Sequence, residues 1–134
     1  MVEQTLDFWP DLATARPKVT PLSLLKQQAA LLGKHTSNLL EGVVRTRSGP
    51  GGTVGHRFII RVPTLEYMYE LFEVSHNMVD LYPVRVDSGP HQTSYRDDHP
   101  LLRSEEAFLQ WLKNVLSSDI TKRVLGSLLA QIES

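Results

Sequence analysis

The chain has 134 residues, a formal net charge of −1, and a composition that is 41% hydrophobic and 22% charged. These values are typical of one soluble globular domain and exclude two domains of ordinary size. The complete lack of cysteine excludes disulfides, zinc–thiolate sites and cysteine nucleophiles, and the near-neutral charge excludes an overall field that would attract nucleic acid or anionic lipid.

Residues 1–19 predict an N-terminal arm, and residues 20–134 predict a single α+β domain. The arm combines apolar anchors with two prolines that interrupt regular structure, namely Leu6, Phe8, Trp9, Pro10 and Pro17. We expect it either to fold back onto its own sheet or to dock on a second chain. It lacks the cationic start and apolar stretch of a secretory signal, so we expect a cytoplasmic protein without membrane contacts.

A helix is predicted to begin at Thr20 and Pro21, because threonine caps free backbone N–H groups and proline suits the first helical position. Its apolar face consists of Leu22, Leu25, Ala29 and Leu32. Gly33 predicts the end of this helix, since glycine readily adopts the left-handed conformation found there.

From residue 39 to 86 the pattern changes to the alternation and β-branched composition of strands. The predicted strands cover residues 40–47, 56–62, 67–74 and 79–86. Their connections are too short for parallel crossovers, so they predict a four-stranded antiparallel meander. A polar stretch at 87–100 predicts a long surface loop.

Alternation also predicts which side chains share a face of the sheet. Phe58, Ile60 and Val62 should face the core, with Ile59 on the other face opposite Val43. Simple alternation along the third strand places Tyr67 and Tyr69 on one face and Phe72 on the other. At least one aromatic face should then need cover, so these tyrosines are candidate partner contacts.

Two helices are predicted after the loop. Ser104 caps the first, with Glu105 and Glu106 near its positive end, and a break at 117–119 precedes the second. Their apolar stripes consist of Phe108, Leu112, Val115, Leu116, Ile120, Val124, Leu128 and Ile132. The predicted order is therefore αββββαα, with the three helices packed on one face of the sheet.

Residues 48–55 are the most glycine-rich segment of the chain. A phosphate-binding loop would lead into a helix and end in lysine and a hydroxyl residue, whereas a predicted strand follows here and lysine is missing. We interpret the segment as a hairpin tip.

Arg45, Arg47, Arg57 and Arg61 form the best basic patch, since strand parity can place them on one face of this hairpin. The patch suggests nucleic acid or an acidic protein as ligand. The next segment, however, carries Glu66, Glu70, Glu73 and Asp80, whose carboxylates can neutralise the arginines across the sheet.

Histidine and aspartate suggest a metal site at His76, His91, Asp98 and His99, although their spacing fixes no coordination geometry. His35 and His91 also begin H-x-[ST] triplets, a pattern that resembles the two-histidine phosphoesterases. A metal- or histidine-dependent phosphoesterase is therefore one alternative function, and nucleic-acid binding through the four arginines is another.

No motif in the sequence supplies an activated nucleophile, an acid/base pair or a preorganised anion site. We therefore predict a small non-catalytic binding or regulatory domain, of the adaptor or immunity type, which needs no cofactor and acts on a protein partner or a second copy. The predicted binding residues are Trp9, Arg45, Arg47, Arg57, Arg61, Tyr67 and Tyr69.

Overall fold

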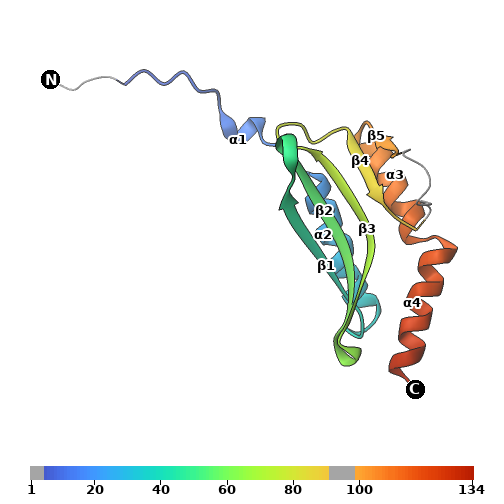
Figure 1. Ribbon diagram of the computed structural model, residues 1–134. Helices are drawn as coiled ribbons and strands as arrows, with labels where there is room; N and C mark the ends of the chain where they lie inside the picture. The colour runs from blue at the N-terminus through green and yellow to red at the C-terminus, as the bar shows by residue number, and fades with distance from the viewer. Residues whose placement is uncertain (1–4, 91–98) are drawn as a thin grey trace.

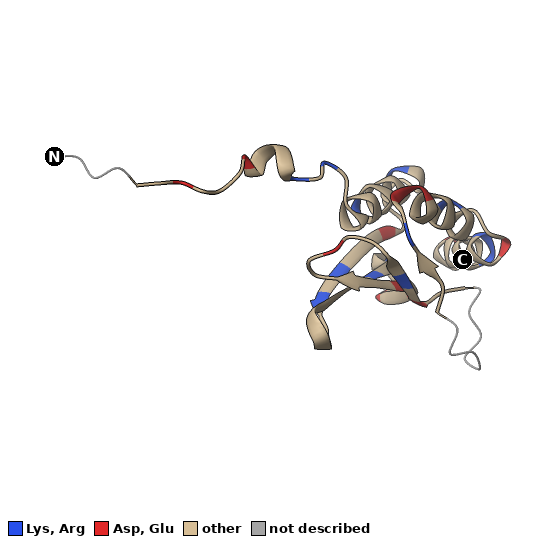
Figure 2. Cartoon of the chain, turned by 90° about the horizontal axis from the view of Figure 1, so that it is seen from above, with Lys and Arg blue, Asp and Glu red and all other residues tan. Residues whose placement is uncertain are grey.

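The computed structural model describes residues 5–90 and 99–134. A five-stranded antiparallel sheet forms one layer, and the three longer helices lie on one side of it, whereas the short first helix belongs to the N-terminal arm (Figure 1, Figure 2). The strands are β1 (Glu41–Ser48), β2 (Thr53–Val62), β3 (Tyr67–Asn77), β4 (Val84–Ser88) and β5 (Leu101–Leu102). The helices are α1 (Leu12–Ala15), α2 (Pro21–His35), α3 (Glu105–Leu116) and α4 (Asp119–Ile132).

The predicted α+β fold is confirmed, since the strands follow one another across the sheet in the order β1-β2-β3-β4-β5. The meander carries one short strand more than the sequence predicted, because Leu101 and Leu102 pair with β4. The fourth strand begins at Val84 and not at residue 79. Pro83 immediately precedes it and has no N–H to donate to a ladder.

Helix α2 begins where the sequence predicted. Thr20 and Ser23 form a reciprocal capping box, and Pro21 occupies the first turn. Its predicted end at Gly33 is wrong, because the helix continues to His35. The left-handed residues are Ser37 and Asn38, with φ of 50° and 64°.

A β-bulge in β3 changes the predicted faces of this strand. Tyr69 lies opposite Ile60 and Phe72 lies opposite Phe58, so Leu71 is the extra residue. An extra residue reverses the alternation beyond it. Tyr69 and Phe72 therefore share a face, and the prediction that separates them is wrong.

The hydrophobic core lies between the sheet and the helices. Its largest fully buried side chains include Phe58, Phe72, Phe108, Leu25, Leu40 and Ile60. Trp111 of α3 stands edge-on to Phe72 with ring centroids 5.0 Å apart. Helix α2 lies so close to β1 that a Cβ added at Gly42 would be 2.5 Å from the Cα of Ala29.

Helix α3 begins at its predicted cap, Ser104, which accepts a hydrogen bond from the N–H of Ala107. Helix α4 follows the predicted break, and Ser118 caps it by accepting from the N–H of Thr121. Leu128 is the buried residue of the predicted α4 stripe, with 7% of its surface exposed.

Leu128→Asp should lower the free energy of unfolding by several kcal/mol, against a total of roughly 5–15 kcal/mol, because it buries an unpaired carboxylate. Ser127→Asp is the matched control, since Ser127 is exposed on the same helix. Urea unfolding followed by circular dichroism measures both variants. A Leu128→Asp variant that unfolds at the control's urea midpoint would show that α4 is not packed as described.

Candidate functional site

The four predicted arginines lie on the face of the sheet that the helices leave uncovered, which we call the open face. Arg45 lies directly opposite Arg57 in the β1–β2 register, and Arg47 and Arg61 have the same parity. Gly42, against which α2 packs, has the opposite parity. Figure 2 shows the basic and acidic residues of the strands intermixed.

Carboxylates do lie among these arginines. Arg57 Nε is 3.0 Å from Glu70 Oε1 and 3.4 Å from Glu73 Oε2, and Arg47 lies 3.3 Å from the same Glu73. Arg61 is 3.1 Å from Glu41. The hydrogen bond from Arg57 lowers the pKa of the Glu70 carboxyl.

The bulge in β3 makes the double contact of Arg57 possible. Glu70 and Glu73 are three residues apart, so an unbroken strand would place them on opposite faces. With Leu71 as the extra residue, Glu70 lies opposite Ile59 and Glu73 opposite Arg57, both on the open face. These exposed ion pairs contribute little to stability, so their main effect is on the shape and charge of the surface.

A hollow of about 750 Å³ lies at one end of the open face. Its floor is a cross-strand row in which Arg47 pairs with Gly55, Gly55 with Ser75, and Ser75 with Arg85. The two central residues are small and the two outer ones are arginines, which explains the depression between them. Glu73, Asn77 and Asp87 add further polar groups to its wall.

The second arginine of this hollow is also paired, since Arg85 Nε is 2.7 Å from Asp87 Oδ1. The sequence reasoning included Arg47 but missed Gly55, Ser75 and Arg85. The available signal was a glycine inside the hairpin flanked by arginines on neighbouring strands. This signal could be recognised only once the strand register was known, because the sequence predicted residues 48–55 as a loop, whereas β2 begins at Thr53.

His76, a candidate metal ligand, is instead part of a buried histidine pair. Its Nε2 lies 2.9 Å from His56 Nε2, and its Nδ1 donates to the carbonyl oxygens of Asn77 and Asp80, at 2.8 and 3.1 Å. His56 Nδ1 lies 2.9 Å from the hydroxyl of Thr46. All four ring nitrogens therefore have a partner.

The donors and acceptors of this pair form one consistent chain. Because His76 Nδ1 faces only carbonyls, it carries the proton, and His76 Nε2 accepts from His56 Nε2. His56 Nδ1 then accepts from the Thr46 hydroxyl. Burial, which disfavours the charged imidazolium, is the largest of the effects that lower the pKa of His56 from 6.5 to about 4.

The structure describes two members of the predicted metal set, His76 and His99, so the set as a whole stays a prediction. His99 Nδ1 lies 3.2 Å from the carbonyl oxygen of Val86. His91 and Asp98 lie outside the described residues. Across 5–90 and 99–134, no three histidine, aspartate or glutamate side chains form a group that could hold a metal ion.

The aromatic candidates do not join the arginines. Tyr69 packs against the core on the helix side, Tyr67 at the end of β3 is 46% exposed, and Trp9 lies in the arm with 79% of its surface exposed. The predicted binding residues therefore occupy three separate surfaces, of which the open face is the one with a hollow lined by charged groups.

Comparison of the chain with protein-family models, with curated proteins and with solved structures finds no match. Within the part of the chain that the structure describes, none of the helices has the length and apolar character needed to cross a bilayer.

Proposed function

We propose that the protein is a non-catalytic binding domain that takes a segment of a protein partner into the hollow on its open face. The observation that supports this is the row Arg47–Gly55–Ser75–Arg85, which places one arginine at each side of a floor of small residues. A hollow of about 750 Å³ accommodates several side chains of a partner.

The charge of the hollow favours a protein over a nucleic acid. Both arginines have a carboxylate within 3.3 Å, so the surface offers donors and acceptors side by side. Nucleic acid would need an uncompensated positive surface against its phosphates. A protein segment with residues of both charges can pair with both the arginines and the carboxylates of the hollow, and such complementarity gives specificity. The lack of cysteine agrees with a cytoplasmic site of action.

Site-specific photo-crosslinking in the native cell tests this proposal. A photoreactive residue replaces Ser48, which is exposed and lines the hollow, or Ser127, which is exposed on α4 as the control. We expect one defined protein to be captured at Ser48 and not at Ser127. Arg85→Glu should reduce this capture by at least about tenfold, because it puts like charges beside Asp87.

The matched variant Arg103→Glu reverses an exposed charge that does not line the hollow and should leave capture unchanged. Capture that is equal at Ser48 and Ser127, or that is insensitive to Arg85→Glu, would contradict the proposal. Capture of material that nuclease destroys would support the nucleic-acid alternative instead.

A further inference from the structure

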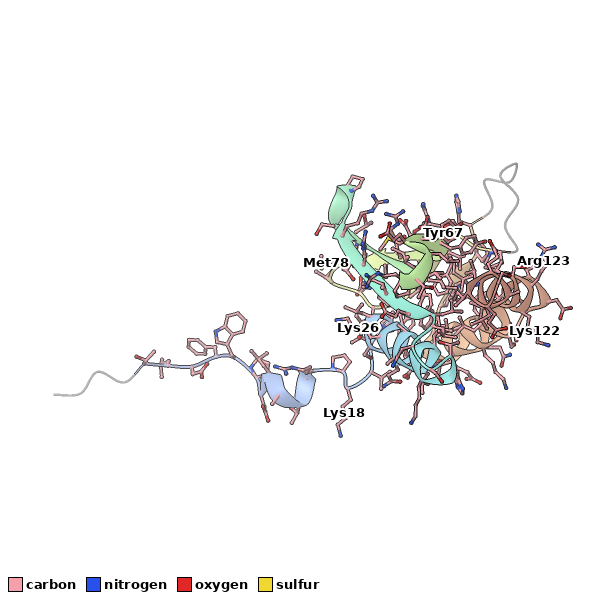
Figure 3. The ribbon with its side chains drawn as sticks, turned by 90° about the horizontal axis from the view of Figure 1, so that it is seen from below. Lys18, Lys26, Tyr67, Met78, Lys122 and Arg123 are labelled. Atoms are coloured by element: carbon pink, nitrogen blue, oxygen red, sulfur yellow. The ribbon has the colours of Figure 1, made fainter. Side chains whose placement is uncertain are left out.

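The arm carries an exposed apolar motif that its own domain does not cover. Leu6, Phe8, Trp9 and Leu12 have 71%, 87%, 79% and 59% of their surface exposed. Figure 1 and Figure 3 both show the arm extending away from the domain. Asp7 and Asp11 bind backbone N–H groups of Trp9 and Ala13, so the motif has local structure before it meets a partner. Four exposed apolar side chains on such a segment are typical of a docking motif.

An apolar groove lies on the helix side of the domain, between α2 and the junction of α3 and α4. It consists of two adjoining hollows of about 440 and 190 Å³ that share Gln28 and Leu116. Leucines from three helices form its walls, namely Leu31, Leu32, Leu109, Leu116 and Leu125. Leu31 and Leu109 are 41% and 43% exposed, so the groove is open to a partner.

The charges of the motif and of the groove are complementary. Residues 5–12 of the arm contain Asp7 and Asp11 and no basic residue. Lys113 lines the groove, and α2 contains lysines but no acidic residue. Lys122 and Arg123 are exposed on α4, as Figure 3 shows. An acidic apolar segment therefore fits this groove with a carboxylate toward Lys113.

The way the arm leaves the domain points to the groove of another copy. The capping box holds Thr20 in extended geometry, with φ −125° and ψ 160°, and Pro21 follows. The groove begins at Gln28, eight residues further along α2, or about 12 Å at 1.5 Å per residue. To reach its own groove, the arm would have to turn back along α2 within residues 13–19.

We propose that the motif at residues 6–12 docks in the α2–α3–α4 groove of a second copy, and that the exchange is reciprocal. Two identical contacts related by a two-fold axis close into a dimer. This contact uses the helix side, so it leaves the open face free and does not depend on the function proposed for that face.

Cysteine cross-linking tests the contact directly, because the natural chain has no cysteine. A tagged Phe8→Cys chain is mixed with an untagged Gln28→Cys chain under mild oxidation. We expect a covalent heterodimer in excess over either homodimer. Val79→Cys replaces Gln28→Cys as the control, since Val79 is 86% exposed and does not line the groove.

Sedimentation equilibrium supplies the second readout. The full chain should dimerise, and Trp9→Ser or Leu31→Ser should weaken dimerisation by at least about tenfold. Both residues are exposed, so both variants should keep the fold. A monomer at all concentrations would overturn the proposal, as would equal cross-linking at Val79→Cys. A Phe8→Cys/Gln28→Cys double variant that closes its disulfide within one monomer would show that the arm occupies its own groove.

Discussion

Replacing Gly42 by alanine should lower the free energy of unfolding by about 3 kcal/mol, the upper part of the usual range for overpacking. The added Cβ would lie 2.5 Å from Ala29 Cα, 2.7 Å from its Cβ and 2.8 Å from its carbonyl oxygen. Two of these three atoms belong to the backbone of α2, so a side-chain rotation cannot relieve the contact. The helix must move away from β1, and the core beneath it loses packing.

Gly126→Ala is the matched control for this substitution. Gly126 lies in α4, and nothing is within 4 Å of the place where its Cβ would be. Alanine there should raise stability by about 0.5–1 kcal/mol, because glycine is costly inside a helix. Urea unfolding of both variants measures the contrast. Equal stability of the Gly42→Ala and natural chains would mean that α2 does not lie against β1 at this distance.

Acidification should destabilise the protein through the buried histidine pair. The pKa of His56 is about 4 in the folded protein and near 6.5 when it is unfolded, so the unfolded chain binds the proton more readily. The stability that neutral His56 provides is fully present above about pH 6.5 and is lost as pH falls toward 4, at about 1.36 kcal/mol per pKa unit. The loss should therefore reach about 3 kcal/mol.

Urea midpoints measured from about pH 7.5 to about pH 4 test this expectation, provided that the slope of the transition stays constant. His56→Gln should be less stable at neutral pH but should lose less stability on acidification than the natural chain. Thr46→Val removes the hydroxyl beside His56 Nδ1 and keeps both imidazoles. It should lower stability while retaining the pH dependence. Identical pH profiles for His56→Gln and the natural chain would contradict the role of the pair.

The sequence predicts those features that local chemistry determines. Thr20 and Ser104 cap helices as expected, and the short connections require the antiparallel meander that is observed. The parity of residues in β1 and β2 brings the arginines to one face, because the register between these strands is regular. These features depend on hydrogen bonds within a few residues, or on the two-residue period of a strand.

Two features of the helix side and the open face depend on one irregularity in the pairing of β2 with β3. If Leu71 were paired with Phe58 in a regular strand, the register set at Tyr67 and Val62 would continue, and His76 would lie on the face opposite His56. The local sequence around Leu71 contains no pattern that predicts the bulge. The packing that it permits, with Leu71 and Phe72 both buried, is a tertiary effect. The histidine pair and the two-glutamate contact of Arg57 were therefore beyond sequence reasoning.

The bulge decides which side chains of β3 face the core, and this assignment changes when a residue is inserted into the strand but not when a side chain is substituted. One residue inserted between Phe72 and Glu73 would reverse the faces of the strand from Glu73 onward, turning that glutamate toward the core. Evolution of this domain should therefore accept many exchanges of side chains along β3 while preserving its length. Length variation is better accommodated at the Pro50–Gly52 hairpin tip, where Gly51 and Gly52 adopt positive φ and have open space around them.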